Sequence, residues 1–405
     1  MRRTLRDWLR VPSVSGSEGP FTRLVADWCR RQGFVVDIWQ AREANLPAHC
    51  SLANHHLPLA GRPTLVTKLP GSGGGRSLIF NAHADVVDAP RPERWSPGPW
   101  SGAVRRGWIH GRGACDVKGP LISALWAMLA ARDLAGDGLA GDVMLELVPG
   151  EEDCVGLGTL TSIARGVKAD AAIVLEPTES LPRCASRAGC RFEITCRGRA
   201  IHGTVKWEGK DAIRLARAVL DALDTLEARW NDRAANRLFA AYPIARPITV
   251  DKVSGGRWQG MICDECLCAG YLELLPDDNI AVWERRLARE LPREVACRGH
   301  DAGNVDIQFT ERYNGHQASP QSPLSRVARR AAGGKGGWSA FNAGCEAGTR
   351  AHLLGTPTLV WGPGSLSLAH ADNERIRFSS VQRVAASFTR LVLDWCGERF
   401  PREEE

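Results

Sequence analysis

The sequence predicts an α/β protein in which a smaller α+β domain is inserted into a larger, discontinuous domain. In the first half of the chain, apolar strand-like runs alternate with helical patterns, an order typical of a largely parallel or mixed sheet. From about residue 184 the pattern changes to alternating strands and long amphipathic helices, and the first pattern returns near residue 314. A chain of 405 residues is also long enough for two domains.

The elements of the larger domain follow from apolar periodicity. Near-continuous apolar runs predict strands, and apolar residues at helical spacing between them predict helices. The expected strands cover 77–87, 142–150, 171–178 and 356–364, and the expected helices cover 118–134, 156–166, 323–332 and a C-terminal segment from about Ser380. This part of the chain therefore comprises residues 1–183 and 314–405.

The inserted domain, residues 184–313, has a different pattern of apolar and polar residues. Residues 191–205, "RFEITCRGRAIHGTV", alternate like a strand with one exposed face, and 211–230 form a long amphipathic helix. A second strand, a second helix and a last strand are expected at 266–278, 278–292 and 304–313. The result is an α+β unit.

Composition describes a globular protein and argues against some partners. The net charge is +6, no run of five basic residues occurs and only three tyrosines are present, so nucleic-acid binding is weakly supported. No uninterrupted apolar run reaches eighteen residues, and the N-terminus lacks an apolar signal-like core, so no membrane span is expected. Thirteen cysteines without repeated spacing favour reduced thiols and a cytoplasmic location.

Potential metal ligands follow nearly every expected strand of the larger domain. A dinuclear hydrolytic site needs imidazoles, several carboxylates and one carboxylate that bridges two ions. In open α/β sheets such ligands lie beyond the carboxyl ends of the strands. The candidates are His83 and Asp85 in "NAHADVV", Asp116 in "GRGACDVKG", Glu151 and Glu152 in "LVPGEEDC", Glu176 in "VLEPTE" and His370 in "LAHADNE".

Each candidate alone has an ordinary explanation. A His-x-Asp pair is usually part of a loop, Asp116 could be a helix N-cap, and adjacent glutamates such as Glu151 and Glu152 are usually solvated surface. Glu176 before a proline could belong to a turn, and His370 could lie on the surface. Their joint placement at strand ends of one domain favours a metal site.

The ordered motifs "HADVV", "GRGACDVKG", "PGEED", "VLEPTE", "GRAIHGT", "GTRAHLLGTPTLVWGPG" and "AHADNE" resemble metallopeptidase family M20 over nearly the whole chain. Within it, the chain is most similar to the acetylornithine deacetylase and succinyl-diaminopimelate desuccinylase branch. The resemblance implies a zinc-peptidase-like α/β/α catalytic domain, an inserted ferredoxin-like lid or dimerisation domain, and a homodimer.

The resemblance also implies roles for residues. His83 and Glu176 would bind one zinc ion, Glu152 and His370 the other, and Asp116 would bridge them. Asp85 would accept the second ring N–H of His83, and Glu151 would be the general base. His202 of "GRAIHGT" would hydrogen-bond the tetrahedral oxyanion, the alternative being a surface histidine on an edge strand. Cobalt or manganese could replace zinc.

Two departures from the family pattern bear on the substrate. Glu273 stands where family members commonly have arginine, and Arg350 stands where acetylornithine deacetylases typically have an acid. Both positions are expected to face the substrate, which argues against acetylornithine, and they could also pair with each other. The single C-x-x-C motif of Cys263 and Cys266, with Cys268, lacks a second ligand pair and favours ordinary packing over a structural zinc site.

The sequence thus favours a dinuclear-metal amidohydrolase that cleaves an acetyl- or succinyl-like N-acyl amide of an amino acid or related small amine. A carboxypeptidase or dipeptidase of the same family is the first alternative. A catalytically silent relative that only binds its ligand is the second, and the intact ligand set with Glu151 argues against it.

Overall fold

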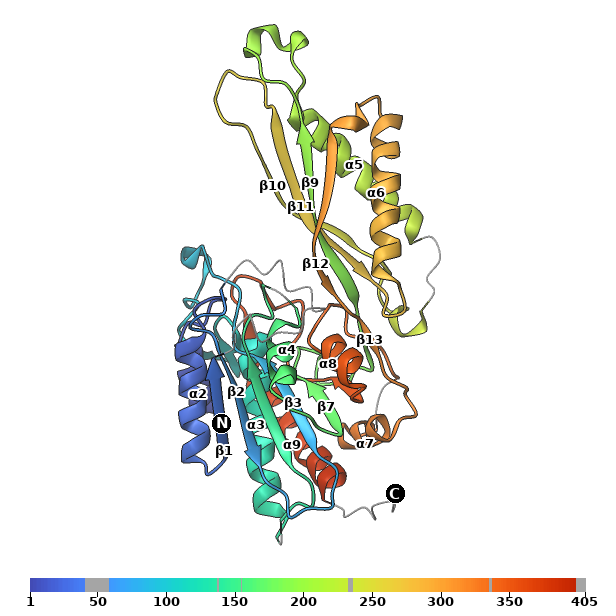
Figure 1. Cartoon of the computed structure of the whole chain (residues 1–405). Coiled ribbons are helices and arrows are strands. Elements are labelled where there is room, and N and C mark those ends of the chain that lie inside the picture. The colour runs from blue at the N-terminus through green and yellow to red at the C-terminus, as the bar shows by residue number, and fades with distance from the viewer. Residues whose placement is uncertain (41–57, 137, 154, 232–235, 335–336, 398–405) are drawn as a thin grey trace. The chain divides into compact units, whose positions relative to one another are not determined.

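The computed structural model describes residues 1–40, 58–136, 138–153, 155–231, 236–334 and 337–397. The chain divides into two compact units, and Figure 1 labels many of their elements. The larger unit comprises residues 1–186, 316–341 and 345–405, and the inserted unit comprises 187–315 with 342–344. The sequence-based boundaries lay after residues 183 and 313.

The larger unit is built on a six-stranded mixed sheet with the order β1-β2-β6-β3-β7-β14. Four neighbouring strands, β6 to β14, run parallel, while β1 and β2 are antiparallel additions at one edge. Every residue of the four parallel strands is buried, which matches their near-continuous apolar sequences. The strands are β1 (Val35–Gln40), β2 (Pro63–Leu69), β3 (Leu78–His83), β6 (Val143–Val148), β7 (Ala171–Val174) and β14 (Thr358–Val360).

Helices cover both faces of this sheet, and two successive residues of β3 contact helices on opposite faces. Successive strand residues point to opposite faces. Phe80 packs its ring against Phe388 of α9, whereas Asn81 donates a hydrogen bond to Thr159 of α4. The helices are α1 (Arg2–Leu9), α2 (Gly19–Arg31), α3 (Gly119–Leu134), α4 (Leu157–Ala164), α7 (Pro323–Ala331), α8 (Ala347–Leu354) and α9 (Phe378–Cys396).

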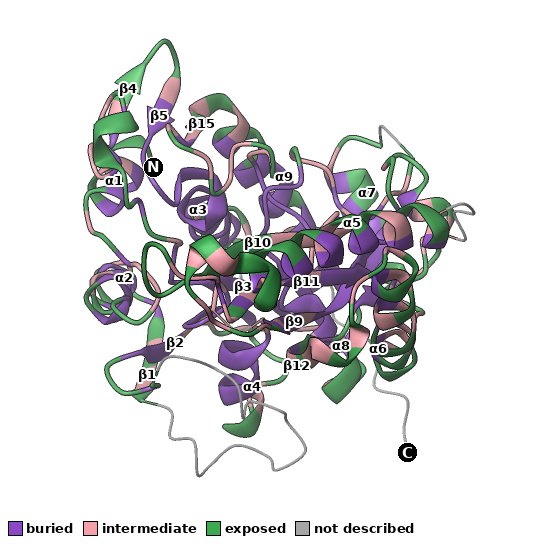
Figure 2. Cartoon of the chain, turned by 90° about the horizontal axis from the view of Figure 1, so that it is seen from above, coloured by how far each residue is buried: buried purple, intermediate pink, exposed green. Residues whose placement is uncertain are grey.

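Helix α3 belongs to the core of the larger unit, as its colouring in Figure 2 shows. It packs against α9 and against strands β3 and β6. Among the described residues, the segment Ala114–Leu134 is long and apolar enough to cross a membrane, but most of it is buried inside the protein. A buried, apolar core helix accounts for that composition.

The inserted unit has the ferredoxin-like arrangement. Its elements follow in the order β9 (Ala188–Arg197), α5 (Ala212–Trp230), β10 (Ile248–Gly255), β11 (Glu265–Leu274), α6 (Ile280–Cys297) and β12 (Val305–Tyr313). The strands form an antiparallel sheet with the order β10-β11-β9-β12. The α/β fold with an inserted α+β unit, as predicted from the sequence, is therefore confirmed.

The cysteines of the inserted unit lie in its hydrophobic core. Cys266 lies opposite Cys196 in the strand register, and both are free thiols. Both belong to the buried cluster beneath α5 and α6, together with Cys263 and Cys268. Within the described ranges, the set of three metal-ligand side chains that lie close enough to share an ion contains none of these thiols. Their burial among apolar side chains fits the packing role expected from the sequence.

Candidate metal centre

The candidate ligands gather at the carboxyl edge of the parallel strands. His83 is the last residue of β3, the Glu151–Glu152 pair follows β6, Glu176 follows β7, and His370 lies in the segment after β14. Because parallel neighbours end at the same edge of a sheet, residues far apart in sequence meet there. Asp116 comes from the loop that precedes α3.

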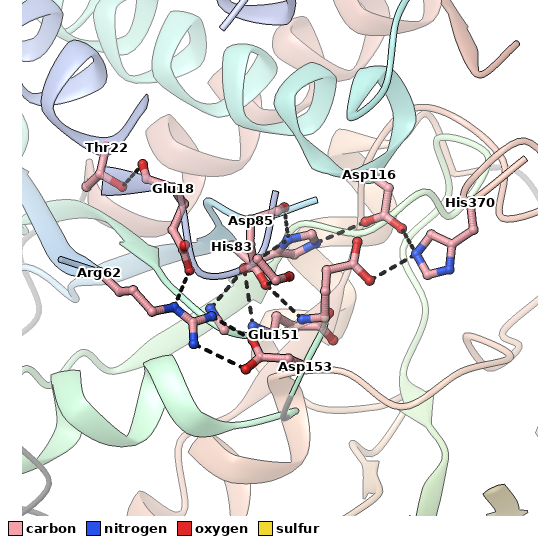
Figure 3. Close-up of polar contacts among 12 residues, drawn as sticks. Glu18, Thr22, Arg62, His83, Asp85, Asp116, Glu151, Asp153 and His370 are labelled. Carbon is pink, nitrogen blue, oxygen red and sulfur yellow. Dashed lines mark hydrogen bonds and ion pairs between the residues drawn. The ribbon is translucent and has the colours of Figure 1, made fainter. Parts of the chain in front are cut away.

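Asp116 lies between two imidazoles (Figure 3). Its Oδ1 is 2.9 Å from Nε2 of His83, and its Oδ2 is 3.3 Å from Nε2 of His370. The same His370 nitrogen is 3.0 Å from Oε2 of Glu152. The ligand atoms of His83, Asp116 and Glu152 all lie within 4.8 Å of one another. One carboxylate thus faces both halves of a site, as a bridging ligand would.

The imidazoles are strongly coupled to the acidic groups. Burial alone would lower the pKa of His370, but contacts with Asp116 and Glu152 raise it to about 11. Burial opposes protonation of His83 as well, and Asp116 nevertheless raises its pKa well above the ordinary value. For Asp116, burial is outweighed by the two imidazoles, which lower the pKa of the carboxyl.

The remaining carboxyl groups are crowded and buried. Burial raises the pKa of Glu151 well above its ordinary value, and the charges of Glu176 and Glu152 raise it further. Burial and Asp116 likewise raise the pKa of Glu176 and of Glu152. One buried oxygen of Glu152, Oε1, has no hydrogen-bond partner. A set of imidazole and carboxylate donors with excess negative charge fits divalent metal ions, which would offset that repulsion.

The structure corrects the role expected for the Asp85 carboxylate. Nδ1 of His83 is hydrogen-bonded to the backbone carbonyl of Asp85 at 2.9 Å, whereas the carboxylate oxygen is 3.8 Å away. The carboxylate instead accepts hydrogen bonds from the backbone N–H groups of 150–152 and from the hydroxyl of Ser15. Asp85 orients the ring through its main chain, and its side chain holds the loop that carries Glu151.

Glu374 is a residue of the site that sequence reasoning missed. Its buried carboxylate accepts hydrogen bonds from the backbone N–H groups of Gly113, Cys115 and Asp116 and pairs with Arg112 at 2.8 Å. These contacts fix the loop that presents Asp116. The only sequence signal was its position four residues after His370 in "AHADNE".

His202 belongs to the inserted unit, whereas the candidate ligands belong to the larger unit. It is exposed, and its Nδ1 lies 2.7 Å from the hydroxyl of Thr204 at the start of a 3-10 turn. Its expected hydrogen bond to an oxyanion stays a prediction.

The substrate-facing role expected for Arg350 is wrong. Its side chain is 0% exposed and pairs with the equally buried Glu146, with 2.5 Å between Nη2 and Oε1. Glu273 is also buried, and burial raises its pKa to about 7 although Arg187 and Tyr313 oppose the shift. Each residue has partners inside its own unit, and the suggested Glu273–Arg350 pair, which would join the two units, stays a prediction.

Comparisons with known proteins identify a family. The sequence model of the Peptidase family M20/M25/M40 matches residues 79–394. The N-formyl-4-amino-5-aminomethyl-2-methylpyrimidine deformylase of Bacillus subtilis (strain 168) is 24% identical, over 96% of this chain and 92% of the relative. The acetylornithine deacetylase of Myxococcus xanthus is 28% identical, over 83% and 84%.

A solved structure shows the same fold. The dipeptidase Dug1p from Saccharomyces cerevisiae superposes with a TM-score of 0.75 at 14% identity, covering 97% of this chain and 95% of that one. A coverage of 97% of this chain includes residues of both units. The family match covers well over half of the chain and includes every candidate ligand. The chain belongs to the Peptidase family M20/M25/M40.

Proposed function

We propose that this protein is a metal-dependent amidohydrolase that removes a small acyl group, such as formyl, acetyl or succinyl, from the nitrogen of a small amine or amino acid. Membership of the family implies a dinuclear metal site. The observation that carries the proposal is Asp116 held between His83 and His370, beside the buried carboxyl of Glu151.

By resemblance to the family, His83 and Glu176 would hold one ion, Glu152 and His370 would hold the other, and Asp116 would be shared between them. When bound, two divalent ions supply Lewis acidity toward water and toward an amide carbonyl. Zinc fits these imidazole and carboxylate ligands, and cobalt or manganese could take its place.

Glu151 is the proposed proton carrier. Its buried carboxyl adjoins the ligand Glu152 but is not needed to complete the ligand set. As a carboxylate it accepts a proton from the attacking water, and it then returns that proton to the leaving amine. The hydrogen bonds from the loop to Asp85 keep the backbone of Glu151 fixed during both transfers.

Two further inferences rest on the family resemblance. His202 is proposed to donate a hydrogen bond to the tetrahedral oxyanion, and the protein is proposed to act as a homodimer. The composition supports a cytoplasmic protein with small-molecule substrates and without nucleic-acid partners.

The acyl class is favoured over the peptide class. The two relatives described above that align along most of the chain are named as a deformylase and a deacetylase. The likeness to a dipeptidase, at 14% identity, concerns the fold alone. The test is a comparison of kcat/KM for N-formyl, N-acetyl and N-succinyl amines and for dipeptides with zinc-loaded protein.

Glu151→Gln should reduce kcat by about a hundredfold to ten-thousandfold while both metal ions stay bound, because it removes the proton carrier but no ligand. Metal content is measured by elemental analysis of the dialysed protein. Glu93→Gln, at an exposed position of the larger unit, is the control and should keep full activity. Hydrolysis by the Glu151→Gln variant at the wild-type rate, or no hydrolysis of any amide by protein carrying two ions, would refute the proposal.

A further inference from the structure

Arg62 is a fully buried cation beside the loop that carries Glu151 and Glu152. Its side chain is 0% exposed, and it lies directly before β2. Nε is 2.7 Å from Oε1 of Glu18, while Nη2 and Nη1 lie 2.6 and 3.1 Å from the two oxygens of Asp153. The pair with Asp153 is therefore bidentate, the geometry that only a planar guanidinium provides.

Asp153 directly follows the two catalytic-site glutamates. The fork from Arg62 thus holds one end of the loop, and the Asp85 carboxylate holds the backbone N–H groups of 150–152 at the other (Figure 3). Ser15 donates to Asp85, and Glu18, three residues later, pairs with Arg62. The contacts close a ring that links the segment before α2, Arg62, the loop and Asp85.

The fit around the fork leaves little room for the loop to shift. Gly150 has φ +78°, and a Cβ atom added there would lie 3.0 Å from Nη2 of Arg62 and 3.1 Å from Leu157. The ring also concentrates negative charge. Burial and then the charge of Asp85 raise the pKa of Glu18 to about 7, although Arg62 opposes the shift. Arg62 is the cation that this charge surrounds.

We propose that Arg62 is a positioning residue for the metal centre. The two hydrogen bonds from Arg62 to Asp153 fix the backbone of the loop. They thereby orient the two preceding side chains, so that Glu152 points to a metal ion and Glu151 points to the water. The inference rests on the proposed function for its kinetic consequence. Its consequence for metal binding is independent of turnover.

The test compares variants that keep or lose the fork. Arg62→Lys preserves the charge but cannot make two parallel hydrogen bonds, and Asp153→Asn removes the accepting carboxylate at the less buried end. Each should weaken binding of the second zinc ion about 10- to 100-fold and lower kcat by a similar factor, with KM changed less than about twofold. Zinc affinity is measured by competition with a chromophoric chelator, which requires no substrate.

Arg165→Lys is the matched control. Arg165 also makes a bidentate contact, through Nε and Nη2 to the two oxygens of Asp37 at 3.1 and 3.2 Å, on the surface of the same unit. This variant should keep wild-type zinc affinity and kcat. If Arg62 and Asp153 act only through their contact with each other, the double variant should lose no more zinc affinity and kcat than the worse single variant.

The outcomes separate this inference from the proposed function. Folded Arg62→Lys and Asp153→Asn proteins with zinc affinity and kcat within twofold of wild type would overturn the positioning role. Lower thermal stability with unchanged zinc affinity would overturn it too, because that is the pattern of a purely structural ion pair. If wild-type protein binds two ions but hydrolyses no amide, the proposed function fails, while the zinc affinities still decide the role of Arg62.

Discussion

Replacing Arg350 by methionine should destabilise the protein by about 3 kcal/mol, because it leaves a buried carboxylate without its cation. Arg350 and Glu146 are both 0% exposed, and 2.5 Å separates Nη2 from Oε1. Removal of one partner from a buried pair costs about 3–5 kcal/mol. Glu146 keeps hydrogen bonds from Asn81 and Ser162, which places the expected cost at the lower end of that range.

The assay is urea-induced unfolding, with free energies obtained by linear extrapolation. Arg350→Met is compared with Glu146→Gln and with the double variant, in which neither charge remains. The double variant should be more stable than Arg350→Met by at least about 1 kcal/mol, since no uncompensated ion is left inside. Arg330→Met breaks a surface pair with Asp394 and should cost less than about 1 kcal/mol.

Two results would refute this reasoning. A loss below about 1 kcal/mol in Arg350→Met would mean that the buried carboxylate finds compensation elsewhere. A double variant no more stable than the single one would mean that packing, rather than charge, dominates. If the variant changed KM without any loss of stability, the substrate-facing role first expected for Arg350 would be restored.

The remaining predictions concern a buried acid and a constrained glycine. Glu273→Gln should become more stable relative to wild type by about 1–3 kcal/mol between pH 4.5 and 8. Burial raises the pKa of Glu273 to about 7, so the wild type is favoured below pH 4.5 and loses that stability as the pH rises from 4.5, the ordinary pKa, to the folded value. Urea unfolding at both pH values measures this, and a pH-independent difference would contradict it. Gly150→Ala should lower stability by about 1–3 kcal/mol and reduce kcat, because φ is +78° and the methyl group would meet Arg62 and Leu157. Thermal unfolding and steady-state kinetics test it, and wild-type values for both would show that the loop adapts.

The sequence predicted where the ligands meet but not which atoms they use. His83 and Glu152 were found because they follow apolar strands, and parallel strands end at one edge of the sheet. The resemblance implied that Asp85 accepts the second ring N–H of His83, yet the sequence could not distinguish a carbonyl from a carboxylate acceptor. Local spacing carries no information on that choice.

Pairings over long sequence distances were also invisible. Arg350 and Glu146 are 204 residues apart, and Arg62 and Asp153 are 91 apart, so no local pattern connects them. Arg350 was read through its difference from related proteins, which suggested substrate contact. A charged residue that differs from related proteins can contact a different substrate, or it can pair with a buried residue of opposite charge. Only its neighbours in the three-dimensional structure show which of the two applies.

The order of the ligands along the chain has a consequence for biosynthesis. His83, Asp116, Glu152 and Glu176 precede the inserted unit, whereas His370 follows it, as do β14, which pairs with β7, and α9, which packs on α3. A ribosome therefore releases four proposed ligands, then the whole inserted unit, before the last one appears. Because N-terminal parts fold first during synthesis, the inserted unit can fold while the larger sheet still lacks its edge strand. A nascent chain that has not yet reached residue 370 lacks the imidazole of His370, so the proposed two-ion site can be completed only after the whole inserted unit has been synthesised.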